Sequence, residues 1–168
     1  MLVEWVWKGN RDTKEAACEL LAKILKLQHH SPSRDELLNI ILKEMAHATN
    51  WQQRKAYIVF CKHAIHTLSR EYFRKHFMKD YLECSQDKVP HVRMEFANAM
   101  LAIKPYFDQD MDLSLELMDT LNNLHNDQDR DVLEAVEHTD FELLQNRKKN
   151  KEVHADDSVE QEKVAYQN

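Results

Sequence analysis

Ten histidines are the residues of this chain best suited to chemistry, because imidazole nitrogen is the commonest side-chain metal ligand. His63 and His66 lie three residues apart, and His29 and His30 are adjacent. A zinc site needs further ligands at a defined spacing, as in the HExxH motif or in paired cysteine–histidine clusters. Neither pattern occurs. The sequence therefore predicts no metal site, and histidines that are exposed or half-buried.

Nucleophiles and acid–base pairs give equally weak signals. The cysteines are Cys18, Cys61 and Cys84. They are far apart and form no CxxC pair, which predicts reduced, mostly buried thiols. His63 follows Cys61 by two residues, a spacing that points the two side chains to different sides of a helix. Asp108 and Asp110 fit helix capping better than acid–base catalysis. We expect no catalytic residues and no cofactor, hence a protein that is not an enzyme.

Composition excludes several further classes. Gly9 is the only glycine, so glycine-rich loops that bind phosphates or dinucleotides are ruled out. The formal net charge of -6 argues against nucleic acid as the main partner. No apolar run approaches the roughly 20 residues that span a bilayer, and the first ten residues lack the pattern of a secretory signal. We expect a cytoplasmic protein that binds neither nucleic acid nor membrane.

The elements that position these side chains are all predicted to be helices. Apolar residues recur at helical spacing in seven stretches, for example Leu37, Leu38, Ile41 and Met45. Tight β-hairpins favour Asn-Gly or Asp-Gly, and neither dipeptide occurs. The sequence therefore predicts an all-α fold.

A period of about 40 residues relates the helices to one another. One position near the start of successive helix pairs is occupied by Lys14, Arg54, Arg93 and Leu133, at spacings of 40, 39 and 40 residues. An apolar column follows three residues later, at Ala17, Tyr57, Phe96 and Val136. Helix pairs at this period are typical of a HEAT-type α-solenoid. We predict about four helical-hairpin repeats over residues 1–145, the first truncated, and a disordered polar tail over 146–168.

The repeated basic residue has a potential partner in the next repeat. A polar turn precedes each helix pair, and two of these turns contain Asp87 and Asp127. An arginine one turn into its helix could reach the turn carboxylate of the neighbouring repeat, as from Arg93 to Asp127. We therefore expect a ladder of ion pairs beside the apolar core.

The two ends of the array differ. Residues Leu2, Val3, Trp5 and Val6 would expose an apolar face at the truncated first repeat, through which the chain could associate with itself. In the last repeat Leu133 replaces the basic residue, and Glu137 and Asp140 occupy positions that are apolar one repeat earlier. A polar outer face is what a terminal repeat requires.

Trp51 stands out because no core periodicity requires a tryptophan in this turn. Its equivalent in the next repeat is Lys88. One interpretation is partial burial against the adjacent turn. The other is an aromatic anchor on a binding ridge.

The turn sequences point to a family. The stretch DKVPHVRMEFANAMLAIKP, Asp87 to Pro105, resembles the HEAT-repeat scaffold and regulatory subunits of type 2A serine/threonine phosphatases. NDQDRDV, Asn126 to Val132, resembles the following repeat, and AHATNWQQR, Ala46 to Arg54, the preceding one. The resemblance covers roughly residues 10 to 145, and the regulatory subunits of protein phosphatase 4 are its nearest branch.

The resemblance implies a non-catalytic subunit that binds a phosphatase catalytic subunit, of the phosphatase 4 type, through its inter-helix turns. The positions that correspond are Asn50, Trp51, Gln52, Gln53, Arg54, Val89, His91, Arg93, Asp129 and Arg130. Trp51 matches an aromatic position of the family, and Arg54 and Arg93 match basic ones. Gln53 and His91 depart from its scaffold members.

Two alternatives stay open on the residues alone. One is a general HEAT-repeat adaptor, unrelated to phosphatases, that binds other proteins. The other is a small helical enzyme or metal protein. Arg54 and Arg93 could also serve the ion-pair ladder alone.

Overall fold

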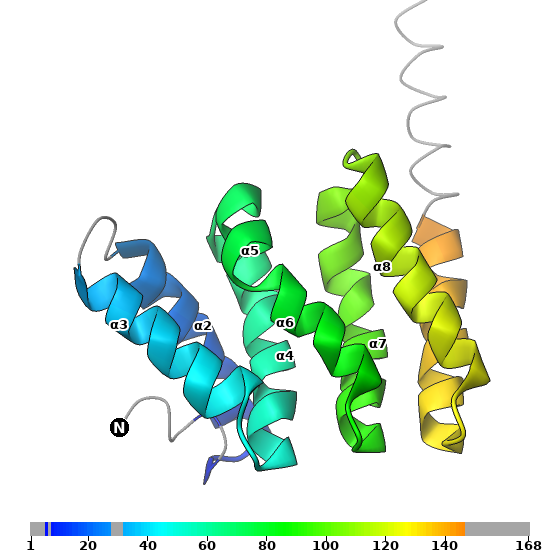
Figure 1. The fold of residues 1–168 in the computed structure, drawn as a ribbon, viewed down its shortest axis with the longest axis horizontal. Helices are drawn as coiled ribbons and strands as arrows, with labels where there is room; N and C mark the ends of the chain where they lie inside the picture. Colours follow the sequence, from blue (N-terminus) through cyan, green and yellow to red (C-terminus); the bar gives the residue numbers. More distant parts are fainter. Residues whose placement is uncertain (1–5, 7, 28–31, 147–168) are drawn as a thin grey trace, which may run out of the picture.

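The computed structural model describes residues 6, 8–27 and 32–146 of the 168, and every regular element among them is helical (Figure 1). The predicted all-α class is confirmed for these residues. One layer contains α2 (Arg11–Leu27), α4 (Trp51–Thr67), α7 (Pro90–Ile103) and a last helix over 130–146. The other contains α3 (Pro32–Ile41), η1 (Leu42–Ala46), α5 (Arg70–His76), α6 (Met78–Glu83), η2 (Cys84–Gln86), α8 (Met111–Asn123) and η4 (Leu124–Asn126), with η3 (Lys104–Phe107) joining α7 to α8.

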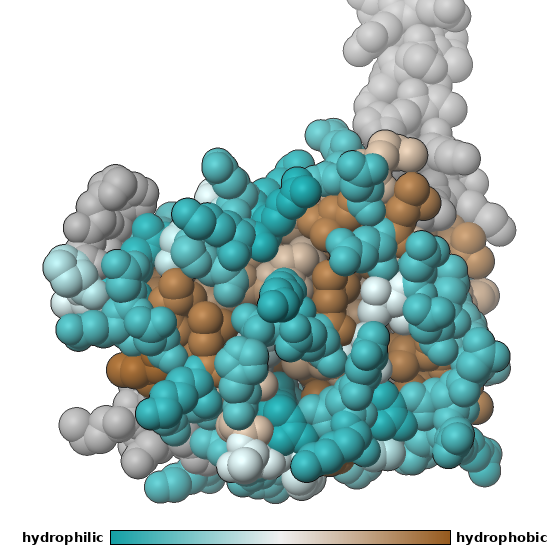
Figure 2. All heavy atoms as spheres, in the orientation of Figure 1, coloured by the Kyte–Doolittle hydropathy of each residue, from teal (hydrophilic) through white to brown (hydrophobic). Residues whose placement is uncertain are grey.

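Among the described residues, the helices form a row of antiparallel pairs, which are α2 with α3, α4 with α5 and α6, and α7 with α8, followed by the helix over 130–146 (Figure 1). Helix α4 packs against α2 on one side and against α7 on the other. The second-layer helices run back across the first layer, and Figure 2 shows this face as mainly hydrophilic, with apolar patches in the furrows. The predicted tail over 146–168 lies outside the described residues, apart from Asn146, which is helical.

Short polar residues begin several of these helices. The side chain of Asn50 accepts a hydrogen bond from the Gln52 amide at 3.0 Å at the start of α4. Ser69 and Asp110 cap α5 and α8 in the same way. Pro90 is the first residue of α7, where its missing N–H is not needed. These caps fix where each helix starts, and so where the turns lie.

The predicted apolar columns form the core. Tyr57, Phe96 and Val136 are fully buried, and Ala17 nearly so. The hydroxyls of Tyr57 and Tyr81 donate to the backbone carbonyls of Phe77 and Phe96. Each column contacts the next pair along the row, so every pair depends on its neighbours to bury its apolar face.

The apolar stripe from Phe73 to Leu82 is not one continuous helix. The chain bends at Phe77, where φ is -128° and ψ is -26°, and this residue separates α5 from α6. With the bend, Phe73 and Phe77 are both fully buried, and Phe77 meets the Phe60 ring edge-on at 5.3 Å. The packing of these aromatic rings favours the bent backbone over a continuous straight helix.

A buried lysine lies where α7 ends. Lys104 is 1% exposed, and its ammonium donates to the Asp108 carboxylate and, at 3.3 Å, to the Ser114 hydroxyl. A buried ammonium is tolerated only with such partners. Lys104 therefore ties η3 to α8 and to the turn between them.

The ends of the array depart from expectation. Val6, predicted to be exposed, is fully buried, while Leu2, Val3 and Trp5 lie outside the described residues. The last helix does present Glu137 to solvent, as predicted, but Phe141 and Leu144 are also more than half exposed. Its outer face is therefore less polar than predicted.

Burial predicts that the thiols of the folded chain are unreactive. All three cysteines are free and buried, and burial raises the pKa of Cys18 and Cys84 from 9.0 to about 12. A rise of that size lowers the thiolate fraction about a thousandfold. We expect Ellman's reagent at pH 8 to label none of the three before unfolding, and all three in guanidinium chloride. Fast labelling of one thiol in the native protein would contradict this packing.

Candidate functional site

The turns that precede the first-layer helices lie along one edge of the row, at the bottom of Figure 1. We call this the turn edge and define it by residues 48–54, 87–93 and 127–130. Side chains from successive turns contact one another along it. The structure thus brings together the turn residues that the sequence predicted as a binding surface.

Arg54 forms the first rung of the predicted ladder. Its Nε and Nη2 donate to the two carboxylate oxygens of Asp87, at 2.5 and 2.9 Å. Its Nη1 donates to the backbone carbonyls of Ala48 and Thr49, at 2.8 and 2.9 Å. The guanidinium therefore stabilises the turn that precedes its own helix and binds the carboxylate of the next turn. Both charged side chains are largely buried, 12% and 7% exposed.

Arg93 repeats this geometry one pair later. Its Nε and Nη2 donate to the Asp127 carboxylate at 2.6 and 2.7 Å, and its Nη1 donates to the Asp87 carbonyl at 2.7 Å. The expected contact between Arg93 and Asp127 is confirmed. Such paired hydrogen bonds are stronger and more directional than a single ion contact. Leu133 occupies the next position and cannot continue the ladder.

The rungs stabilise the charged forms of their members. The hydrogen bond from Arg93 and the nearby guanidinium charge lower the pKa of Asp127 despite its burial. The hydrogen bond to Asp127 in turn raises the pKa of Arg93, and Asp87 does the same for Arg54. The ion pairs are therefore retained over the whole neutral range.

Two more of the predicted contact residues accept hydrogen bonds from backbone amides. The Asn50 side chain caps α4, and the Asp129 carboxylate accepts from the amides of Asp131 and Val132 at the start of the last helix. With Arg54 and Arg93, four of the ten predicted residues have side chains that form hydrogen bonds within this chain. Their side chains shape the turn edge.

Trp51 lies between the two interpretations offered by the sequence. Its ring is half-buried, packs against the core and lies 5.5 Å from the His91 ring of the next turn. It also borders a groove of about 490 Å³ between α2 and α4, lined in part by Lys14, Lys55 and Glu95. The tryptophan thus joins adjacent turns and keeps one face toward a groove.

The exposed part of the turn edge is polar and mostly uncharged or basic. Exposed side chains are those of Thr49, Asn50, Gln52, Lys88, His91, Gln128 and Arg130. Gln53 and Val89 are half-buried. Lys88 and Gln128 were not among the predicted contacts, although each directly follows an aspartate of the ladder. That adjacency is the signal that could have identified them.

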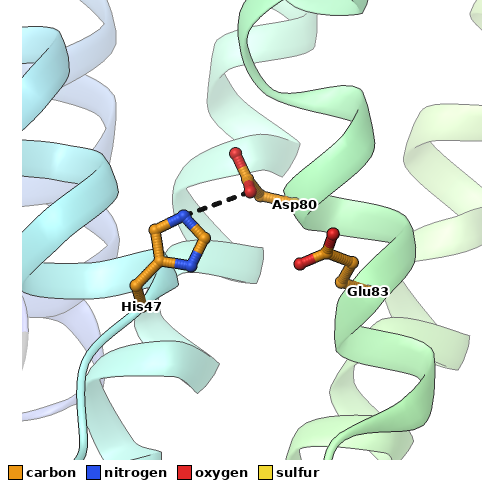
Figure 3. Close-up of side chains that lie close together, drawn as sticks. All are labelled: His47, Asp80 and Glu83. Atoms are coloured by element: carbon orange, nitrogen blue, oxygen red, sulfur yellow. Dashed lines mark ion pairs between the residues drawn. The ribbon is translucent and has the colours of Figure 1, made fainter.

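A second cluster lies beside the turn edge and was not predicted. His47 Nε2 is 3.2 Å from an Asp80 oxygen, and Glu83 lies one helical turn further along α6 (Figure 3). One ligand atom from each of the three lies within 4.8 Å of the others, close enough for the three side chains to share one metal ion. Burial raises the pKa of Asp80, an effect to which Glu83 adds and which His47 and Lys79 oppose.

Comparison with known proteins does not assign the chain to a family. No family model matches the chain, and no curated protein matches it significantly. Among the residues that the structure describes, no helix has the length and apolar character needed to cross a membrane.

The ladder predicts strong coupling between Arg93 and Asp127. In a double-mutant cycle with Arg93→Ala and Asp127→Ala, we expect a coupling free energy of about 1–3 kcal/mol, because the pair is bidentate and desolvated. Urea unfolding followed by circular dichroism gives the four free energies. The matched control is Lys79 with Glu83, an exposed pair 3.9 Å apart, for which we expect about 0–0.5 kcal/mol. Equal coupling in both cycles would contradict the ladder.

The ladder also predicts acid sensitivity. The pKa of Asp127 is lower in the folded chain than its usual value of 3.8, so the unfolded state binds the proton more readily. The contribution of this rung is complete above the unfolded pKa and is lost as the pH falls through the folded pKa. We expect the free energy of unfolding of the wild type to drop between about pH 5 and pH 2. The drop should be smaller in Asp127→Asn; equal slopes would contradict it.

Proposed function

We propose that this chain is a non-catalytic regulatory or scaffold subunit that binds a serine/threonine phosphatase catalytic subunit through the turn edge. The proposed catalytic subunit is of the phosphatase 4 type, and the proposed location is the cytoplasm. The architecture we infer is a HEAT-type α-solenoid of about four repeats. The mechanism is contact: the chain alters the targeting or activity of the phosphatase and performs no chemistry of its own.

The observation that carries this proposal is the repetition of one turn geometry. The rungs from Arg54 to Asp87 and from Arg93 to Asp127 have the same donors and nearly the same distances. They hold successive turns in register, which is what a surface made of separate turns needs if it is to bind one partner. The resemblance of these same turns to phosphatase scaffolds supports the choice of partner.

The contact residues in this proposal are the exposed members of the edge. Gln52, His91 and Arg130 come from three successive turns, and the ring of Trp51 lies beside that of His91. A half-buried aromatic side chain among polar neighbours fits the description of an interface anchor. Arg54 and Arg93 act by positioning the turns.

One observation favours a second candidate, a general adaptor that binds another class of protein. Arg54 and Arg93 are the basic residues that match phosphatase scaffolds, yet every one of their hydrogen bonds serves the ladder. An arginine ladder of this kind would stabilise a repeat protein whatever its function. The two candidates differ in whether a phosphatase is retained.

The test is co-purification of the full chain with the catalytic subunits of phosphatases 4 and 2A. We expect the wild type to retain one of them, and a variant with Trp51→Ala, His91→Glu and Arg130→Glu to retain about tenfold less or worse, since central anchors dominate such interfaces. Circular dichroism must show that the variant is helical. Failure of the wild type to retain either subunit would favour the adaptor.

A matched control reverses charge away from the turn edge. Arg70 and Lys75 are exposed on α5, at the opposite end of the helices (Figure 1). The variant with Arg70→Glu and Lys75→Glu should retain as much phosphatase as the wild type. Equal loss in both variants would indicate nonspecific charge effects and contradict the assignment to the turn edge.

A further inference from the structure

The cluster of His47, Asp80 and Glu83 joins two neighbouring helix pairs (Figure 3). His47 directly follows η1, at the end of the first pair, while Asp80 and Glu83 project from α6 of the second. The spacing of three residues along α6 places both carboxylates on the same side of that helix, facing the imidazole. We propose that these three side chains form a binding site for one divalent transition-metal ion, with zinc as the probe.

The geometry is close to that of a bound ion. Ligands at about 2.0–2.2 Å from a tetrahedral zinc lie about 3.4 Å from one another. The His47 nitrogen and the Asp80 oxygen are already 3.2 Å apart. All three ligand atoms lie within 4.8 Å of one another, and His47 and Glu83 are exposed, so small rotations of these side chains would complete the triangle. Water would fill the remaining positions.

Charge favours a cation here. Asp80 has a side chain that is only 16% exposed, and its ion-pair partner is the imidazole of His47. The other charged groups around the site are Glu83, Lys79, Arg54, Asp87 and Lys88. Arg54 is fully engaged with Asp87, and Lys79 contacts Glu83 only at 3.9 Å. Two carboxylates therefore lie beside one imidazole, and Lys79 makes only a long contact with one of them.

The donor set selects the class of ion. One imidazole nitrogen with two carboxylate oxygens suits zinc and its first-row neighbours, whereas magnesium and calcium prefer oxygen ligands alone. The groove beside the cluster, about 440 Å³, is open enough to admit a hydrated ion.

The site belongs to one interface of the row. His47 and Asp80 precede the rung residues Arg54 and Asp87 by seven positions each. Seven positions before the next rung lie Gln86 and Thr120, which are poor metal ligands. A bound ion would therefore connect the end of η1 to α6. It would stiffen the interface at which Arg54 contacts Asp87, and not the one at which Arg93 contacts Asp127.

Metal content is measured on the full chain after chelator treatment, zinc loading and dialysis. We expect one zinc per chain, and visible ligand-field bands when cobalt replaces zinc. X-ray absorption should show one imidazole in a shell of nitrogen and oxygen. A hundredfold excess of zinc over its dissociation constant should raise the Tm by about 5–10 °C. Absence of bound zinc would overturn the proposal.

Single substitutions identify the ligands. His47→Ala, Asp80→Asn and Glu83→Gln should each weaken zinc binding at least about tenfold, because loss of even an outer partner of a metal ligand costs that much. Glu83 is exposed and glutamine is isosteric with it, so of the three variants Glu83→Gln should disturb the fold least. The matched controls are His125→Ala and Glu116→Gln, both exposed, which should bind zinc as the wild type does. Unchanged binding in the three cluster variants would assign the zinc to other histidines and overturn the site.

Discussion

The structure depends on one repeated contact, the bidentate pair between an arginine at the start of a helix and the aspartate of the next turn. A two-helix unit cannot bury its apolar face, so each unit must stack on another in a fixed register. Apolar side chains supply most of the free energy but little direction. The guanidinium supplies direction, since its paired donors join the carbonyls of its own turn to the neighbouring carboxylate.

The aromatic core and the ladder have different structural roles. Tyr57, Phe60 and Phe77 fill the space between layers, and their burial forces the bend that separates α5 from α6. The ladder lies outside that core and determines how one pair is rotated against the next. The core supplies most of the stability and the ladder fixes the positions of the turns, so the exposed turn side chains remain free to serve binding.

Much of this could be predicted from the sequence, because a 40-residue period makes the same position comparable across pairs. The columns through Tyr57 and Phe96 and the rung from Arg93 to Asp127 follow from spacing alone. The bend at Phe77 could not, since it results from ring packing between layers. His47 and Asp80 are 33 residues apart and belong to no motif, and Lys104 finds its partners only after the chain turns at Pro105. Such contacts are fixed by tertiary structure.

The rungs lie on one edge only, and this has a mechanical consequence. At the turn edge the paired charges are 7–16% exposed, whereas Arg74, which joins α5 to Asp110 at the other end of the helices, is 59% exposed and makes a single contact. Salt screens the second kind of pair far more than the first. The contacts along the turn edge should therefore depend less on ionic strength than the contacts at the opposite ends of the helices. The curvature of the row would respond to ionic strength while the spacing of the turns stays constant.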